Sequence, residues 1–193
     1  DGGGITPDIE VVPEQLSQVA TELYLRNFIF DYATRYYWAH PNIKNPSDFV
    51  FTDKDYSDFN DFLKKRGFNY TTATETSFLK LVESAKREKY YDSHKEMFDE
   101  IEKDITHSLD HDLVLFKTEI TELLEEEIIS RYFYEEGSIE WGITKDEQVM
   151  KALEILNNRE KYVSILSGKA EPVLVTNTAR DKEVKTKAEL KTN

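Results

Sequence analysis

The chain has 193 residues, of which 38 are acidic and 25 basic, and its net charge is −13. Such a charge repels nucleic acid and anionic lipid, so it argues against binding either one and favours solubility or a basic partner. There is no cysteine, which excludes disulfides, thiolate metal sites and cysteine nucleophiles. The length predicts one domain or one and a half.

The first residues predict a loop followed by an extended segment. Gly2–Gly4 allow backbone angles that other residues avoid, and Pro7 favours extended geometry before it. Ile9 and Val11 then alternate with polar residues, as in a strand. A single short strand is not stable alone, so we expect its sheet in a missing part of a longer protein or in a neighbouring copy. The start at Asp1, on three glycines, also favours a segment of a longer protein.

The stretch Leu23–Ala39 contains seven aromatic side chains. Apolar residues fall on nearly every side of a helical wheel, which predicts a buried helix. We expect one central helix from about Glu14 to Ala39, with Pro13 at its first position and His40-Pro41 at its end. No stretch is apolar enough to predict a signal peptide or a membrane span.

The remaining helices are predicted from capping residues and from apolar side chains three and four positions apart. They span residues 54–66, 72–90, 93–107, 109–136, 144–156 and 159–166. Their start signals are Thr52 or Asp53, the capping-box spacing Thr72–Glu75 and the capping-box spacing Thr144–Glu147, and their stop signals are Gly67 and Gly137.

The predicted fold class is mainly α, a multi-helix bundle with two long helices preceded by one short β-strand. We divide the chain into a terminal strand in residues 1–12, a helical domain in residues 13–167 and a weakly structured tail in residues 168–193. The tail is rich in Lys, Glu and Thr after Val173–Val175, which disfavours a packed core there.

Two short patterns could carry chemistry. His107 and His111 are four residues apart, and two imidazoles at this spacing on one helix face can share a metal ion. The residue after His107 is not glutamate, so the zinc-protease pattern is absent, and the spacing straddles a predicted helix break. Two solvated histidines are therefore the preferred interpretation. Ser77 and Lys80 match a serine–lysine nucleophile pattern, but its companion motifs are absent and both residues flank a buried helical stripe.

Other polar features have simpler explanations. The acidic run on the second long helix has no Glu-x-x-His partner for a two-metal site, so we expect a solvated helix face made of Glu119, Glu122, Glu125, Glu126 and Glu127. Asn69-Tyr70-Thr71 fits a glycosylation acceptor, and Gly2–Gly4 could cradle an anion but are predicted to form a turn. The sequence therefore predicts no catalytic, metal-binding or cofactor-binding residue and no cofactor.

Three segments resemble one protein family. Gly2–Val11 is similar to the G-G-I-x-P-D-[IV]-x-V segment at the end of the catalytic domain of bacterial carboxyl-terminal processing, or tail-specific, proteases, the S41 serine peptidases. Phe28–Thr34 and Arg131–Gly137 resemble helical segments of the C-terminal extension in the larger members. The likeness of the helical part spans residues 25–167.

The resemblance implies a parent serine endopeptidase that cleaves near protein C-termini. Its serine–lysine dyad would lie upstream of this segment, and a PDZ domain would present substrate tails. The fragment itself is then an inactive helical scaffold or interaction domain. Its implied partners are the rest of the protease, the parent's protein substrates, further copies or an adaptor protein, and its implied location is the bacterial periplasm or cell envelope.

Two alternatives remain open. The chain could be an independent, all-helical protein-binding module that uses its aromatic or acidic surface. It could also be a metal-dependent hydrolase built on His107 and His111.

Overall fold

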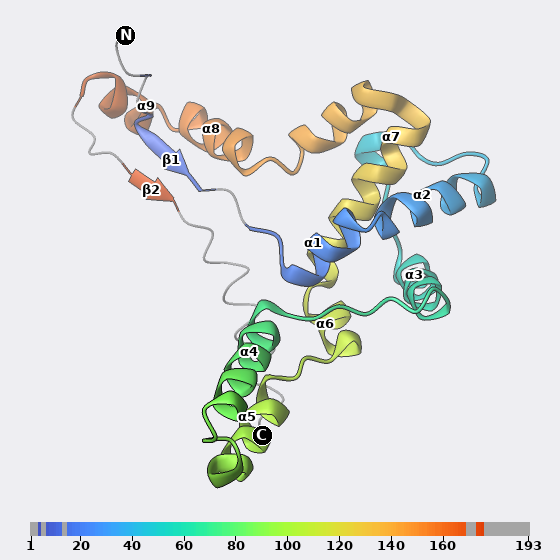
Figure 1. The fold of residues 1–193 in the computed structure, drawn as a ribbon. Helices are drawn as coiled ribbons and strands as arrows, with labels where there is room; N and C mark the ends of the chain where they lie inside the picture. Colours follow the sequence, from blue (N-terminus) through green and yellow to red (C-terminus); the bar gives the residue numbers. More distant parts are fainter. Residues whose placement is uncertain (1–3, 5–6, 13–14, 169–172, 176–193) are drawn as a thin grey trace. The chain divides into compact units, whose positions relative to one another are not determined.

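The fold is described by a computed structural model for residues 4, 7–12, 15–168 and 173–175 (Figure 1). The chain divides into two compact units, named here by their place in the sequence. The middle unit comprises Ser17–Tyr32 and Phe51–Leu123, and the flanking unit comprises Asp1–Leu16, Ala33–Val50 and Leu124–Asn193. Nine α-helices occur in the described part of the chain, which confirms the mainly helical fold class. None of these helices is long and apolar enough to cross a membrane.

The predicted helix from Glu14 to Ala39 is wrong, because the chain forms two helices there. They are α1 (Gln18–Leu25) and α2 (Phe28–Ala39). Asn27 separates them with a φ of 63°, a left-handed conformation that asparagine tolerates better than most residues. The side chain of Ser17 accepts a hydrogen bond from the Ala20 N–H and so begins α1. Pro13 and Glu14 lie outside the described residues.

These two helices bury one side, not every side as expected. Their buried residues recur at helical spacing: Val19, Ala20, Leu23, Phe28, Ile29, Tyr32, Ala33 and Tyr36. Between them lie exposed apolar side chains, among which Trp38 is 79% exposed. The aromatic richness of the segment therefore reflects a buried stripe together with exposed rings.

The core of the middle unit is an aromatic cluster between α2 and α3 (Asp53–Lys65). Tyr32, only 1% exposed, makes edge contacts with Phe51, Phe59 and Phe62. Its hydroxyl donates to the Asp55 carbonyl oxygen at 3.1 Å, so the buried ring keeps a hydrogen bond. The predicted ends of α3 are confirmed. Thr52 caps its start, and Gly67 follows its end with a φ of 64°.

A second small core joins α4 (Ala73–Arg87) to α5 (Lys95–Ile105). Phe78, Ala85 and Phe98 are buried against each other, with Val82, Tyr91 and Ile105 packed around them. The capping box of Thr72 and Glu75 is present as predicted. A 3₁₀ turn, η2 (Asp92–His94), lies between the helices, so the second one begins two residues later than expected.

The second long helix is also interrupted. The structure has α6 (Leu109–Leu115) and α7 (Lys117–Ile143), which meet at Phe116. Gly137 does not end α7, contrary to the prediction. The helix instead kinks at Tyr134, where φ is 57° and ψ is −153°. Gly137 is needed for another reason. A Cβ at that position would lie 2.1 Å from the Phe133 Cβ, so the kinked backbone leaves no room for a side chain.

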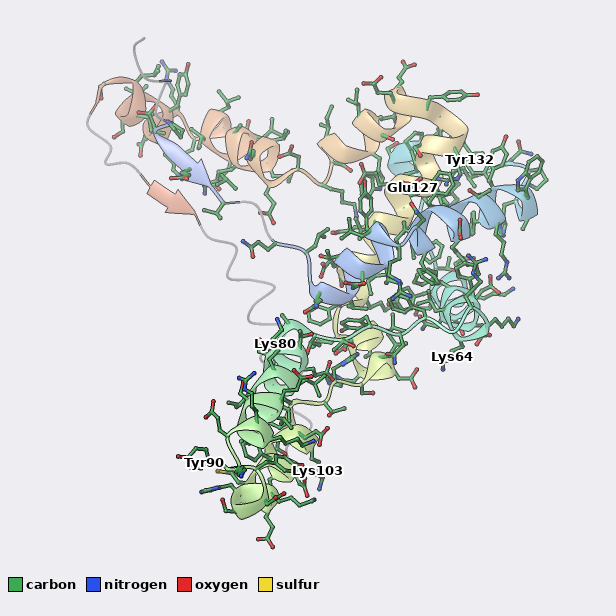
Figure 2. All side chains as sticks on the ribbon, in the orientation of Figure 1. Lys64, Lys80, Tyr90, Lys103, Glu127 and Tyr132 are labelled. Atoms are coloured by element: carbon green, nitrogen blue, oxygen red, sulfur yellow. The ribbon has the colours of Figure 1, made fainter. Side chains whose placement is uncertain are left out.

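In the flanking unit, α7 packs against the C-terminal part of α2. Leu124, Ile128 and Ile129 are fully buried. Arg131 donates from Nη2 to the Thr34 hydroxyl at 3.0 Å, and from Nη1 to the Glu127 carboxylate at 2.7 Å. The Tyr132 hydroxyl donates to the His40 carbonyl oxygen. Glu127 and Tyr132 both project from α7 in Figure 2.

The flanking unit also contains α8 (Glu147–Asn157), α9 (Arg159–Leu166) and the strands β1 (Ile9–Val11) and β2 (Val173–Val175). The predicted capping box at Thr144 is wrong, because Asp146 caps α8 by accepting from the N–H groups of Gln148 and Val149. Thr144 instead donates to the Trp141 carbonyl oxygen of the preceding helix. A connecting 3₁₀ turn, η1 (Pro46–Asp48), lies after α2.

The strand β1 is confirmed, but the expectation that all its partners lie outside the chain is wrong. It pairs in parallel with β2, so that Ile9 lies opposite Val173 and Val11 opposite Val175. These three tail residues were expected to be weakly structured. The rest of the predicted tail after Gly168, and the anion cradle at Gly2–Gly3, lie outside the described residues.

Candidate functional site

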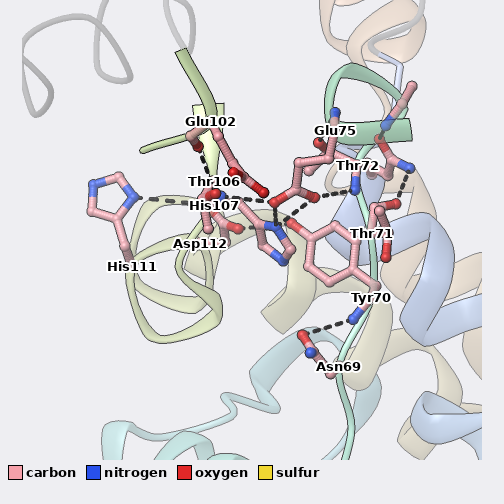
Figure 3. A network of polar contacts seen from close by, with 12 residues as sticks. Asn69, Tyr70, Thr71, Thr72, Glu75, Glu102, Thr106, His107, His111 and Asp112 are labelled. Carbon is pink, nitrogen blue, oxygen red and sulfur yellow. Dashed lines mark hydrogen bonds and ion pairs between the residues drawn. The ribbon is translucent and has the colours of Figure 1, made fainter. Parts of the chain in front are cut away.

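A cluster of polar side chains in the middle unit surrounds Glu75 (Figure 3). It comprises Tyr70, Thr72, Glu75, His107 and Asp112, which we call the Glu75 network. Its members come from the segment before α4, the first turn of α4, the segment between α5 and α6, and α6 itself. The network therefore joins parts of the chain that are about 30 to 40 residues apart.

Glu75 is placed by the start of α4. Its Oε2 accepts from the Thr72 N–H at 2.7 Å, while the Thr72 hydroxyl accepts from the Glu75 N–H at 3.1 Å. This reciprocal pair satisfies two backbone donors that the first helical turn leaves free. One oxygen of the same carboxylate remains directed at the chain that follows α5.

His107 forms hydrogen bonds with that oxygen. Its backbone N–H donates to Glu75 Oε1 at 3.1 Å, and its ring Nδ1 lies 2.8 Å from Oε1 and 2.9 Å from Oε2. Because the carboxylate can only accept, Nδ1 is the donor. Both side chains are about 15% exposed, at 14% for His107 and 15% for Glu75. The imidazole is thus held in one orientation by a single carboxylate.

These hydrogen bonds hold the carboxylate of Glu75 in its ionised form. Burial alone would raise the pKa of Glu75, but the bonds from Thr72 and His107 outweigh burial and lower the pKa to about 2. Glu75 therefore carries a negative charge throughout the physiological pH range.

Tyr70 connects His107 to Asp112. The ring centroids of Tyr70 and His107 are 4.3 Å apart, and the Tyr70 hydroxyl donates to Asp112 Oδ2 at 2.7 Å. Burial, together with the Asp112 carboxylate, raises the pKa of Tyr70 well above its usual value. Tyr70 therefore stays protonated and remains a hydrogen-bond donor to the buried aspartate.

A hollow of about 290 Å³ lies beside the network. Its walls combine polar and apolar side chains: Asn69, Tyr70, Thr71, Glu75, Phe78, Leu79, Glu102, Ile105, Thr106 and His107. The Thr106 hydroxyl donates to the Glu102 carbonyl oxygen at 2.7 Å and so is held by the end of α5. The imidazole lies against a carboxylate, but the described contacts pair it with no serine or threonine hydroxyl. The arrangement suits cross-linking of chain segments more than nucleophilic chemistry.

The structure separates the two histidines of the candidate metal site. His107 faces Glu75, whereas the ring of His111 lies apart from that pair in Figure 3, with its Nδ1 3.7 Å from Asp112 Oδ1. The His111 side chain is 44% exposed. Across the described residues, no cluster of three or more His, Asp or Glu side chains could hold a metal ion. Each histidine instead lies beside its own carboxylate, His107 beside Glu75 and His111 beside Asp112.

Ser77 and Lys80 do not form a nucleophile–base pair in the described contacts. The Ser77 hydroxyl donates to the Ala73 carbonyl oxygen one turn earlier, at 2.8 Å. Both residues are exposed beside the buried Phe78, as expected for residues that flank a buried stripe. Lys80 is visible on the surface of α4 in Figure 2.

The acidic run is not a uniformly solvated face, which corrects that expectation. Glu125 is only 5% exposed, and its carboxylate lies 3.8 Å from the Lys145 ammonium. Glu119 accepts from the Ser17 N–H at 2.5 Å at the start of α1. These side chains fix helix starts and helix contacts. Asn69 is exposed, and its Oδ1 accepts from the Tyr70 N–H.

Sequence reasoning missed Tyr70 and Asp112. In the sequence, Tyr70 stands out only as the middle residue of a glycosylation pattern, and Asp112 belongs to no recognisable motif. The available signal was weak. Asp112 directly precedes Leu113, which helical spacing relates to the apolar residues Phe116 and Ile120, and a buried aspartate requires a polar partner.

A family model described as "Probable PDZ-protease, C-terminal helical domain" matches residues 19–156, more than two thirds of the chain. No curated protein and no solved structure matches the chain. The matched segment begins in α1, ends in α8 and includes the whole Glu75 network.

Proposed function

Because the chain belongs to the family of C-terminal helical domains of probable PDZ-proteases, we propose that it is the non-catalytic scaffold and interaction domain of a carboxyl-terminal processing serine endopeptidase of the S41 class. The observation that carries this proposal is the match over residues 19–156. The opening segment Gly2–Val11, with its resemblance to the end of such a catalytic domain, supports the specific protease class.

The side chains of the helical domain support a structural role. The ring of His107 is bonded to a capping carboxylate, and the Ser77 hydroxyl is bonded to its own helix. Acyl transfer requires a nucleophile, a base and a group that stabilises developing charge, held together. Under this proposal those groups belong to the protease portion of the parent protein, which would act in the bacterial periplasm or cell envelope.

The proposed partners follow from the same assignment. Other protease domains are partners of any such helical domain. The parent's substrates would be proteins with accessible C-terminal tails, and an adaptor or a second copy could also use the helical surface. The role of the domain would be to position these partners relative to the catalytic residues.

A comparison of two purified proteins tests the proposal. The 193-residue chain and its full-length parent would be incubated with an unfolded protein that ends in an apolar tail. We expect cleavage near the C-terminus by the parent, its loss after treatment with a serine-directed inhibitor, and no cleavage by the chain alone. Serine-type turnover by the isolated chain would contradict the proposal.

A second candidate is an independent, all-helical protein-binding module. The pairing of β1 with β2 favours it, since part of the sheet is completed within the chain. The gene distinguishes the two candidates. A reading frame that continues upstream into a G-S-x-S-type nucleophile segment supports the protease assignment, and a start codon directly before the Asp1 codon supports the independent module.

A further inference from the structure

The helix α8 is amphipathic, yet none of its residues is buried in the described structure. Its apolar side chains recur at intervals of three and four positions, as in a helix that packs against a partner: Val149, Met150, Leu153 and Leu156. We call these four residues the α8 stripe. Met150 is 54% exposed, Leu153 is 47% exposed and Leu156 is 61% exposed.

The α8 stripe is not the face that meets the sheet. The side chains of α8 beside β1 are Gln148, Lys151, Ala152 and Ile155, which share a hollow of about 300 Å³ with Pro7 and β1. That face includes an amide and an ammonium group. The more apolar side of the helix is therefore turned away from β1 and remains uncovered, with α8 lying next to β1 in Figure 1.

Two general considerations require a partner for this surface. A helix of 11 residues is marginal in water unless its apolar face packs against something. A parallel sheet also normally has both faces covered, and two strands alone are not independently stable. The helix α9 strengthens the case, because it too has no buried residue while Val163 and Leu166 are 53% and 69% exposed.

The position of β1 in the chain indicates which partner covers the α8 stripe. β1 precedes the matched helical segment 19–156, and α8 forms the end of that segment. In a protein whose C-terminal domain is this one, the polypeptide coming from the protease portion passes through β1, directly beside α8. A tethered neighbour has a high effective concentration at such a place. The protease portion of the same polypeptide is thus favoured over a free partner.

Charge argues against a second copy. The chain has a net charge of −13, so two copies repel each other. Residues 147–166 carry three acidic and three basic side chains, which leaves this region locally neutral and suited to an apolar contact.

Resting on the proposed function, we infer that the α8 stripe is the surface on which the protease portion of the parent protein docks. The contact would cover the α8 stripe, while the face formed by Gln148, Lys151, Ala152 and Ile155 lies beside β1. Docking would then fix α8, β1 and the protease portion as one packed layer.

Hydrogen exchange of backbone amides, compared between the isolated 193-residue chain and the full-length parent, tests this inference. We expect the amides of α8 to exchange at least about 10-fold more slowly in the parent, with those of α4 unchanged. In the parent, the double substitution Leu153→Gln and Leu156→Gln should restore fast exchange in α8. The matched control is Leu79→Gln with Leu81→Gln on α4, where the leucines are 53% and 54% exposed, and it should leave α8 protected.

Two outcomes of the exchange measurement overturn the inference. Equal exchange of α8 in both proteins would show that the protease portion does not cover it. Protection in the isolated chain that increases with concentration, together with a doubled mass in solution, would assign the stripe to a second copy. The result is separate from the proteolysis assay, because α8 protection in a parent without serine-type activity would refute the proposed function and retain the docking surface. Far-UV circular dichroism of each variant checks that it is folded.

Discussion

His107 donates both its backbone N–H and its ring Nδ1 to the carboxylate of Glu75, the residue that completes the capping box of α4. One side chain thus holds a helix start and the segment between α5 and α6. Removing the Glu75 side chain leaves hydrogen-bond donors on both segments unsatisfied. The loss in the free energy of unfolding is then larger than that of an ordinary surface substitution.

We predict that Glu75→Ala destabilises the chain by about 1–3 kcal/mol, since it removes a cap and the bonds to His107. Chemical denaturation followed by circular dichroism measures the change. Glu83→Ala is the control, because Glu83 is exposed on the same helix. Equal stability of the two variants would show that the network contributes nothing.

The same carboxylate predicts a stability change in acid. Its pKa is lowered to about 2 in the folded chain, below the value of 4.5 for a free glutamate. The folded state therefore holds the ionised form more strongly, so the contribution is complete above pH 4.5 and is lost as the pH falls toward 2. In thermal unfolding at pH 6 to pH 2, the stability advantage of the unmodified chain over Glu75→Gln should shrink below pH 4.5. An advantage that stays constant to pH 2 would contradict this prediction.

Tyr70→Phe removes the hydroxyl that donates to the buried Asp112. We expect a loss of about 1–3 kcal/mol in the free energy of unfolding, because a buried carboxylate loses a partner. Tyr90→Phe is the matched control, since Tyr90 is 61% exposed. Urea denaturation of both variants provides the measurement, and a loss no larger than that of the control would argue against the bond.

Replacing each of the two glycines of α7 by alanine should change the stability of the chain in opposite directions. Gly137→Ala places a Cβ 2.1 Å from the Phe133 Cβ and should destabilise by about 2 kcal/mol or more, as overpacking does. Gly142→Ala meets nothing within 4 Å and should stabilise by up to about 1 kcal/mol through helix propensity. Melting temperatures of the two variants measure the contrast. A stabilising Gly137→Ala would mean that the helix runs straight through Tyr134.

Local signals in the sequence located several helix ends but not the helix breaks. Thr52, Thr72 and Gly67 were identified because capping and left-handed termination depend on one or two nearby residues. The breaks at Asn27 and Tyr134 depend on positive φ angles at non-glycine residues. Tertiary packing holds such angles in place, and no hydrophobic periodicity reveals them.

The candidate site could be predicted only in part for a similar reason. Thr72 and Glu75 follow from sequence spacing, whereas the contact with His107 joins residues 32 positions apart. The strand partner of β1 was beyond prediction as well. Val173–Val175 is a short apolar run, and only the fold shows that it lies beside a strand more than 160 residues earlier.

The parallel register of β1 and β2 has a mechanical consequence. The polypeptide enters β1 and leaves β2 in the same direction, so tension applied from outside the two strands pulls them past each other lengthwise. The interstrand hydrogen bonds then bear the load together and do not open one at a time. A force applied along the polypeptide would therefore first have to separate these six paired residues. Only then would it act on the helices that lie between the two strands in the sequence.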